Sequence, residues 1–502
     1  MTKSSNPWVV LTIISGALLL IGIDMTVLNV ALPRLTQELG ASTSEKLWMV
    51  NAYSLIMAGL LPGFGTLADR VGHRTILIWG MVIFGLSSVF AAFSINPTML
   101  IAARGFLAIG AAMMMPATLS IVRLVFKEDQ ERATAIGVWG AVWGGSAALG
   151  PIIGGLLLEH FWWGSVFLIN VPVVLITLYF AFTRIPHIPG NPERHWDAVT
   201  SALLTMSLIA LLYGIKSMIK ADIYWDEVGI SLVVGLAFGW LFLRRQKTQS
   251  SPLVDFNLFR NLRFSMGVTV AVVAGFSLLG VQYVISQELQ LVRGMSPLQA
   301  GLFLLPIAAA SFISGPAVGG LMLKVGIERM MAIMLGVGFA GLALYTVTGH
   351  LAPQLWEFTT MAIIGLGAGG SMAVASTAIM ISAPEDRAGM AGSIESISYE
   401  LGGTLGVAVM GSMLATLFTE GFVAPSGITL PKSAWDSLDQ AMLAVSDMPD
   451  AIAQRVLEAG NAAFMVGANA TFVLGTLVSG LLFVAAAIYA WNKKPTPIVV
   501  KH

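Results

Sequence analysis

The stretch WVVLTIISGALLLIGIDMTVLNVAL, residues 8–32, is an apolar run whose only ionisable side chain is Asp24. It is longer than the roughly 20 apolar residues that a helix needs to cross a bilayer. A carboxylate at membrane depth costs on the order of 2.5–3.5 kcal/mol on insertion scales, so such a residue indicates a function. The run therefore predicts a membrane-spanning helix with a functional carboxylate.

Apolar runs of similar length recur along the chain. Of its 502 residues, 56% are hydrophobic and 11% are charged, whereas a soluble domain usually carries about 25% charged residues. The runs predict an all-α polytopic membrane protein with fourteen spans, near 8–32, 47–67, 75–94, 98–121, 134–158, 163–183, 199–218, 228–243, 264–287, 298–322, 329–349, 355–381, 389–417 and 463–491. An even number puts both termini on one side. Lys and Arg gather in the loops of that side, which predicts cytoplasmic termini.

The composition also narrows the function. A net charge of zero argues against a nucleic-acid surface, and the lack of cysteine excludes disulfides, thiolate metal sites and cysteine nucleophiles. None of the six histidines has a second ligand at metal spacing. The chain has neither a nucleophile–base cluster nor a GxxxxGK[ST] motif for ATP. We therefore expect no metal, no cofactor and no enzymatic activity.

Two segments of the chain repeat each other. LPGFGTLADRVG, at the end of the second predicted span, matches SGPAVGGLMLKVG, at the end of the tenth. The matched pairs share one offset and are Pro62 with Pro316, Gly65 with Gly319, Leu67 with Leu321, Arg70 with Lys324, Val71 with Val325 and Gly72 with Gly326. The repeat predicts two six-helix halves, 1–185 and 256–502, with two inserted helices at 186–255. Parallel six-span repeats are a transporter architecture, with the substrate site between the halves.

A long external loop is predicted at about 418–462. Ser433 and Asp436, three residues apart, predict the cap of a short amphipathic helix there. The loop is either a lid over the outer mouth or a helical hairpin that packs on the surface.

The segment GTLADRVGHRT, residues 65–75, joins the second and third predicted spans. A tight turn needs glycine, and Asp69 can bond a neighbouring helix N-terminus or an arginine. The segment resembles the signature loop of the major facilitator superfamily, G-x-L-A-D-[RK]-x-G-[RK]-[RK], with His73 in place of a usual basic residue. The resemblance implies that Asp69 and Arg70 latch the cytoplasmic side when the transporter faces outward. It implies gating roles for Gly65, Asp69, Arg70, Gly72 and Arg74.

Two more segments resemble this superfamily. ALGPIIGG in the fifth span resembles the antiporter motif G-x-x-x-x-G-P-x-x-G-G, where glycines let helices pack closely and proline bends the span. The residues that match are Gly145, Gly150, Pro151, Gly154 and Gly155. Arg104 in the fourth span matches the family's membrane arginine, and a buried arginine almost always has a partner.

The segment IDMTVLNVALP, residues 23–33, resembles the first-span motif of the fourteen-span drug:proton antiporters, L-D-x-T-V-V-N-V-A-L-P. WMVNAYSLIMAG, RATAIGVWG, FLINVP and GVAVMGS extend the resemblance over nearly the whole chain. It implies the major facilitator fold in a bacterial cytoplasmic membrane. It also implies proton-coupled export of quaternary ammonium compounds, dyes and drugs of the methyl viologen class.

The thirteenth predicted span, AGSIESISYELGGTLG, carries Glu395 and Glu400. Five residues turn a helix by about 500°, so these carboxylates project roughly 140° apart and cannot form a dyad by themselves. One can face the cavity while the other meets a neighbouring span or a buried donor such as Arg104. Glu395, which shares a face with Tyr399 four residues on, is the one that we expect to act.

The carboxylates Asp24, Glu395 and Glu400 predict a mechanism. A desolvated carboxylate can hold a proton near neutral pH, and a proton and a cation compete for one negative charge. This competition is the basis of antiport. Lipophilic cations need apolar and aromatic walls, and the candidates are Met25, Asn51, Tyr53, Trp139, Trp143, Ser311 and Tyr399. Asn51 and Ser311 stand where relatives can carry acidic residues.

The expected partners are lipophilic cationic small molecules, protons and the lipid bilayer, and we expect a monomer. Two alternatives stay open. The first is a proton-coupled transporter of a neutral or anionic metabolite such as a sugar, although the spans hold few Asn and Gln. The second is a membrane sensor, although the chain has no sizeable soluble domain.

Overall fold

The structure, a computed structural model, describes residues 6–41, 43–187, 189–193, 196–218, 224–248, 252–348, 353–384, 387–446 and 448–492. Within its helices some side chains lie outside the description, among them those of Asn51 and Pro151. The described residues form helices and loops without a strand, which confirms the all-α prediction.

The helices follow the predicted spans closely. The first half contains α1 (Pro7–Leu39), α2 (Thr43–Val71), α3 (His73–Ala92), α4 (Pro97–Val125), α5 (Asp129–His160), α6 (Ser165–Leu168) and α7 (Asn170–Arg184). The inserted pair is α8 (Ala198–Ser217) and α9 (Trp225–Gln246). The second half contains η1 (Phe256–Arg260), α10 (Leu262–Gln287), η2 (Glu288–Val292), α11 (Pro297–Phe303), α12 (Leu305–Val325), α13 (Ile327–Thr348), α14 (Gln354–Ser382), α15 (Ala388–Gly421), η4 (Lys432–Trp435), α16 (Leu438–Ala444) and α17 (Asp450–Asn492).

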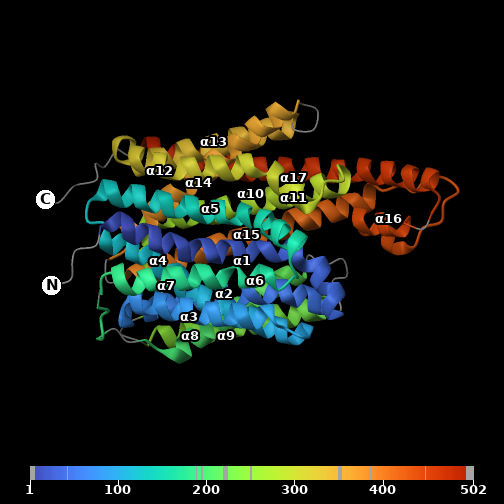
Figure 1. Ribbon diagram of the computed structural model, residues 1–502. Coiled ribbons are helices and arrows are strands. Elements are labelled where there is room, and N and C mark those ends of the chain that lie inside the picture. Colours follow the sequence, from blue (N-terminus) through green and yellow to red (C-terminus); the bar gives the residue numbers. More distant parts are fainter. Residues whose placement is uncertain are drawn as a thin grey trace.

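Thirteen helical segments of the described residues are long and apolar enough to cross a membrane. The remaining predicted span, 134–158, corresponds to α5, which lies within the bundle but has side chains outside the description (Figure 1). The spans predicted at 163–183 and 298–322 are each divided into a short and a long helix. The second break coincides with a proline in the first turn of α12, a position that proline tolerates.

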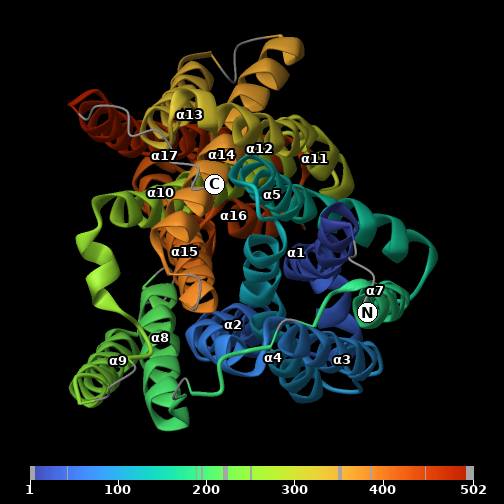
Figure 2. The ribbon, with the colours of Figure 1, turned by 90° about the vertical axis from the view of Figure 1, so that its left-hand side faces the viewer.

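The helices form two bundles that lie against each other. Figure 2 shows α1–α4 and α7 on one side and α10–α17 on the other, with α8 beside α2 and α15 and with α9 on the far side of α8. Helices α1 and α17 have their first and last residues, respectively, at one end of the assembly, here called the terminal end (Figure 1). The core of the first half extends into the second there, because Met380, Ala383 and Met390 of the α14–α15 turn region belong to it.

The repeat predicted from the sequence has a backbone counterpart. Gly72 ends α2 with φ 104° and ψ 131°, and Gly326 ends α12 with φ 91° and ψ 146°. The two glycines end their helices in the same way, because the N–H of each donates at 2.8 Å to the carbonyl of the residue four positions earlier. Pro62 and Pro316 likewise lie inside α2 and α12. Both turns therefore use a backbone conformation that residues other than glycine rarely adopt.

The external segment differs from the prediction. Helix α16 begins at Leu438 after Ser437, so the predicted cap by Ser433 and Asp436 is wrong, and the side chain of Ser433 lies outside the description. Residues 450–462 belong to α17, which is 43 residues long and extends beyond the bundle beside α16 (Figure 1). Leu438 and Val456 are buried in one apolar cluster with Phe422. These contacts support the surface hairpin, and a lid stays a prediction.

The paired turns generate a stability prediction. Alanine at Gly326 has to adopt a strained backbone, so we expect Gly326→Ala to destabilise the protein by about 1–3 kcal/mol. Gly320→Ala is the control, because its φ is not positive and nothing lies within 4 Å of an added methyl group. Thermal unfolding in detergent measures both. Equal melting temperatures for the two variants would refute the strain at Gly326.

Candidate functional site

A cavity lies between the two halves. Its volume is about 100 Å³. Its wall is formed by α1, α5, α10, α12, α14 and α15. Gln282 and Ile307 lie near the ends of α10 and α12 that are far from the terminal end, so the cavity extends toward the opposite, outer end. Glu400 is the one charged side chain among the described wall residues.

The structure separates the residues expected at the cavity into two groups. Met25, Trp143, Ser311, Tyr399 and Glu400 lie in the wall.

Tyr53 and Trp139 are not in the described wall, contrary to the expectation. The Tyr53 ring lies 4.4 Å from the guanidinium carbon of Arg104, and the Trp139 indole donates to Thr118 Oγ1 at 3.0 Å. Both rings are buried because they pack inside the first half. The side chain of Asn51 lies outside the description.

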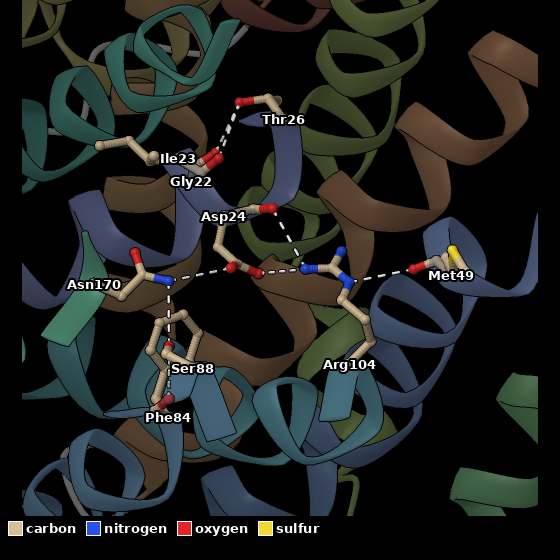
Figure 3. A network of polar contacts seen from close by, with 9 residues as sticks. All are labelled: Gly22, Ile23, Asp24, Thr26, Met49, Phe84, Ser88, Arg104 and Asn170. Atoms are coloured by element: carbon tan, nitrogen blue, oxygen red, sulfur yellow. Dashed lines mark hydrogen bonds and ion pairs between the residues drawn. The ribbon is translucent and has the colours of Figure 1, made fainter. Parts of the chain in front are cut away.

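Asp24 forms an ion pair inside the first half (Figure 3). Its Oδ2 accepts a hydrogen bond from Arg104 Nη1 at 2.5 Å, and its Oδ1 accepts one from Asn170 Nδ2 at 3.2 Å. Arg104 Nε donates to the Met49 carbonyl at 3.2 Å, and Asn170 also donates to Ser88 at 3.3 Å. Asp24 is 0% exposed and Arg104 is 1% exposed. The network joins α1, α2, α3, α4 and α7.

This placement corrects the view of Asp24 as a group in direct contact with a cation in the cavity. Gly22, Met25 and Thr26 of α1 line the cavity, whereas Asp24 is absent from the described wall. Its charge is already balanced by Arg104. Among the three carboxylates considered from the sequence, Asp24 is thus the one that pairs with this arginine. Asp24 can act on the cavity only through this network.

Glu395 lies in a different environment from Glu400. It is 0% exposed, its Oε1 accepts a hydrogen bond from Ser376 of α14, and its Oε2 has no hydrogen-bond partner. No ion pair to Glu395 occurs within the described part of the chain. A carboxylate charge is costly at such a position, because no cation among its described contacts balances it.

Tyr399 connects this site to the cavity. Its hydroxyl donates to the Met372 carbonyl at 3.2 Å, and both residues line the cavity. Glu395 and Ser376 form the adjacent contact between α15 and α14, four residues away on each helix. Residues four apart lie on one face of a helix, about 6 Å along its axis. Glu395 is therefore one helical turn from the cavity wall, toward the terminal end.

At the terminal end α2 and α15 touch, and we call this contact the gate. Asp69 Oδ1 accepts from the Gly389 N–H at 2.8 Å, and Oδ2 accepts from the Met390 N–H at 3.3 Å. These N–H groups belong to the first turn of α15, the kind of partner that the sequence predicts for Asp69. Gly65 and Gly389 face each other, and a methyl group on either would overlap the other's carbonyl oxygen. The gate is closed.

The basic residues of the signature loop are arranged differently. Arg70 is exposed. Arg74 donates to the Phe182 carbonyl at 2.6 Å and to the Ala181 carbonyl at 3.4 Å, so it binds the end of α7 within its own half. Their predicted parts in a latch between the halves stay predictions. His73, which stands where the motif usually has a basic residue, contacts the acidic residue of the motif: its Nε2 lies 3.4 Å from Asp69 Oδ1.

The glycine-rich motif of α5 packs on α1 and the second half. A methyl group on Gly150 would overlap Thr26, and one on Gly155 would lie 3.3 Å from Leu298 of α11. Gly145 faces Phe312 of α12, and Gly154 is buried. The side chain of Pro151 lies outside the description. Closer to the terminal end, Gly137 and Gly315 bring the backbones of α5 and α12 into contact, which closes the cavity on that side.

Comparison with known proteins agrees with this geometry. Residues 14–407 match the Major Facilitator Superfamily. The chain belongs to this superfamily. Its members are transporters, so the protein is a membrane transporter and not an enzyme. The fold matches solved members: the human organic anion transporter MFSD10 (TETRAN) has a TM-score of 0.62 at 16% identity, covering 94% of this chain and 99% of that one.

Curated relatives place the chain among the superfamily's fourteen-span drug exporters. The methyl viologen resistance protein SmvA of Salmonella typhimurium is 38% identical over 91% of this chain and 93% of its own. The multidrug efflux pump LfrA of Mycolicibacterium smegmatis is 34% identical over 96% of both chains. The predicted resemblance is therefore confirmed, and the protein is a multi-pass transporter of the multidrug efflux group.

The sequence reasoning missed three features of this superfamily member. Asn170, which binds Asp24, lies in FLINVP, a segment noted only for its resemblance. Arg293 binds two buried carboxylates of the second half, Glu288 at 2.9 Å and Glu357 at 2.5 Å. Arg123 joins the halves near the gate. Both arginines lie close to predicted loops, where a side chain is ordinarily expected to be solvated.

The Asp24–Arg104 pair generates a prediction for this transporter. Asp24→Asn leaves Arg104 buried without its counter-charge, so we expect a loss of about 3–5 kcal/mol in stability. Asp24→Asn with Arg104→Gln removes both charges and should recover most of the melting temperature in detergent. Equal stability of Asp24→Asn and the parent would contradict the structural part of this pair. Drug efflux by the double variant then tests coupling: recovered efflux would mean that the Asp24 charge is not needed for transport.

Proposed function

We propose that this transporter exports lipophilic cations in exchange for protons by alternating access, with Glu400 as the group that takes the cation. The observation that carries the proposal is the position of Glu400 as the one charged side chain among the described residues of a mainly apolar and aromatic wall. A carboxylate there attracts a cation and repels an anion. Because water is partly excluded, the attraction is stronger than at a surface.

The wall also suits varied substrates. Trp143 and Tyr399 offer aromatic faces to a cation, and Met25 and Met372 are flexible side chains that adapt to different shapes. Gln282 is the one side-chain amide among the described wall residues. A sugar site needs more amides and hydroxyls, so this composition supports lipophilic cations over a neutral metabolite. The names of the relatives, a methyl viologen resistance protein and a multidrug pump, support the same substrate class.

Two carboxyl groups on α15 supply the coupling in this proposal. Glu400 holds either a proton or the cation, because one negative charge cannot satisfy both. Glu395 holds a further proton one turn away, behind Tyr399. Both groups move with α15, the helix that also forms the gate. A movement that opens the gate therefore changes the access of both carboxyl groups to water.

The orientation completes the proposal. With the cytoplasmic termini of this proposal, the gate lies on the cytoplasmic side and the cavity extends toward the outside, which supports an outward-facing state. Protons from outside reach the carboxyl groups in this state, and cations bind from the cytoplasm after the gate opens. Moving one charge across 100 mV is worth about 2.3 kcal/mol, so the membrane potential can contribute to the exchange.

The cavity carboxylate can be tested by binding. We expect Glu400→Gln to weaken binding of ethidium or methyl viologen at least about tenfold, because two opposite charges 4 Å apart attract by about 4 kcal/mol at an effective dielectric of 20. Glu420→Gln is the matched control, an exposed glutamate on the same helix. Tryptophan fluorescence or calorimetry with purified protein measures the affinities. Unchanged affinity in Glu400→Gln would remove Glu400 from the cation site.

Proton release tests the coupling itself. Addition of ethidium to the purified parent in weak buffer should release protons, and Glu395→Gln should release fewer per bound cation while it still binds the dye. The reason is that glutamine keeps the hydrogen bond with Ser376 but carries no titratable proton. Ethidium efflux from cells that persists unchanged with a proton uncoupler would count against antiport as a whole.

A further inference from the structure

Arg123, in the last turn of α4, reaches across to the second half. Its Nη2 donates to the Ala383 carbonyl at 2.5 Å and its Nη1 to the Pro384 carbonyl at 3.4 Å. Ala383 ends α14, whose last residues leave carbonyl groups without partners in the helix. Arg123 is 8% exposed, so this contact is buried within the closed gate region.

The α14–α15 turn is thus bound from the first half at both of its helix ends. The C-terminal end of α14 carries partial negative charge and receives the Arg123 cation, while the N-terminal end of α15 carries partial positive charge and receives the Asp69 anion. Each charged group matches the sign of the helix end that it contacts. We call this arrangement the double cap.

The double cap is not a general consequence of the repeat. When the ends of the corresponding helices are matched, Asp69 of α2 aligns with Leu323 of α12, and Arg123 of α4 aligns with Met380 of α14, neither of which is charged. Both capping charges therefore come from the first half.

A different arginine binds the residues that follow α4. The last carbonyls beyond α4 are bound by Arg132, whose Nε donates to the Phe126 carbonyl at 3.0 Å and whose Nη2 donates to the Lys127 carbonyl at 3.2 Å. Arg132 thus binds the segment that follows α4, and Arg123 binds the end of α14.

We propose that Arg123 is a gating residue: with Asp69 it forms the double cap that holds the gate closed, and both contacts must break before the terminal end opens. The proposal rests on the alternating access proposed above. It assigns Arg123 a part that neither the signature loop nor the glycine motif covers. Loss of either charge then weakens the closed gate, because Arg123 and Asp69 bind different ends of the α14–α15 turn.

The chain lacks cysteine, so a single introduced thiol can report the gate. Ala391→Cys places that thiol on α15 at a position that is 0% exposed and belongs to the core shared by the two halves. Labelling uses a membrane-impermeant maleimide on purified protein, without substrate or a proton gradient. We expect Arg123→Met to raise the labelling rate about tenfold, because hydrogen bonds to a charged group are lost from the closed state only. Asp69→Asn should raise it as well.

Arg132→Met is the matched control, since it removes an arginine that caps a helix end within one half. It should label like the parent. Arg123→Lys keeps the charge with fewer donors and should give an intermediate rate. If a melting curve shows that Arg123→Met does not fold, Arg123→Lys alone provides the test. Parental labelling in the folded Arg123 variants, or an equal rise in Arg132→Met, would overturn the proposal.

The readout separates this proposal from the proposed function. Labelling depends on the closed gate alone, whereas proton release and uncoupler-sensitive efflux depend on antiport. Faster labelling together with efflux that ignores the uncoupler would retain the double cap and reject the antiport.

Discussion

The pairing of Asp24 with Arg104 is the interaction on which the first half depends. Two charges at membrane depth are tolerated only when each satisfies the other, and here a guanidinium, an amide and a carbonyl complete the hydrogen bonds. Because the participating residues come from five helices, the pair fixes how these helices lie relative to one another. This network therefore also positions the part of α1 that lines the cavity, which includes Met25 and Thr26.

Helix α15 brings the remaining functions together. Along one continuous helix it presents the gate at Gly389, a protonatable group at Glu395 and the cavity wall at Tyr399 and Glu400. A rigid helix transmits a displacement at one end to the other. In the proposed mechanism, α15 therefore links the cavity to the gate through its own backbone.

Much of the fold followed from the sequence, and the reasons differ between elements. Span positions depend on local hydropathy, and the turns at Gly72 and Gly326 depend on a local backbone requirement, so both could be read from neighbouring residues. The length of α17 depends on packing between distant segments, because Val456 in its outer part lies in one apolar cluster with Leu438 and Phe422. No local pattern separates an external loop from a helix that continues beyond the bilayer.

The site was predictable in its residue types but not in their pairing. Asp24, Arg104, Glu395 and Glu400 all stand out as charges in apolar segments. Which of them pairs with Arg104 depends on helix rotations, which a single sequence does not contain. The same limit applies to Tyr53 and Trp139, because an aromatic ring in a span has the same composition whether it faces a cavity or a core.

The inserted pair α8 and α9 is attached on both sides of the gate. Before it, the Asn191 N–H donates to the Asp69 carbonyl at 2.9 Å and the Trp196 indole donates to the Gly63 carbonyl at 3.0 Å. After it, Asp255 is paired with Arg387 at the start of α15. The segment between them thus works as a tether with one fastening on each moving body. The chain that leads into the inserted pair thus contacts the first half, and the chain that leads out of it contacts α15, so the movement proposed above has to be accommodated between these two contacts.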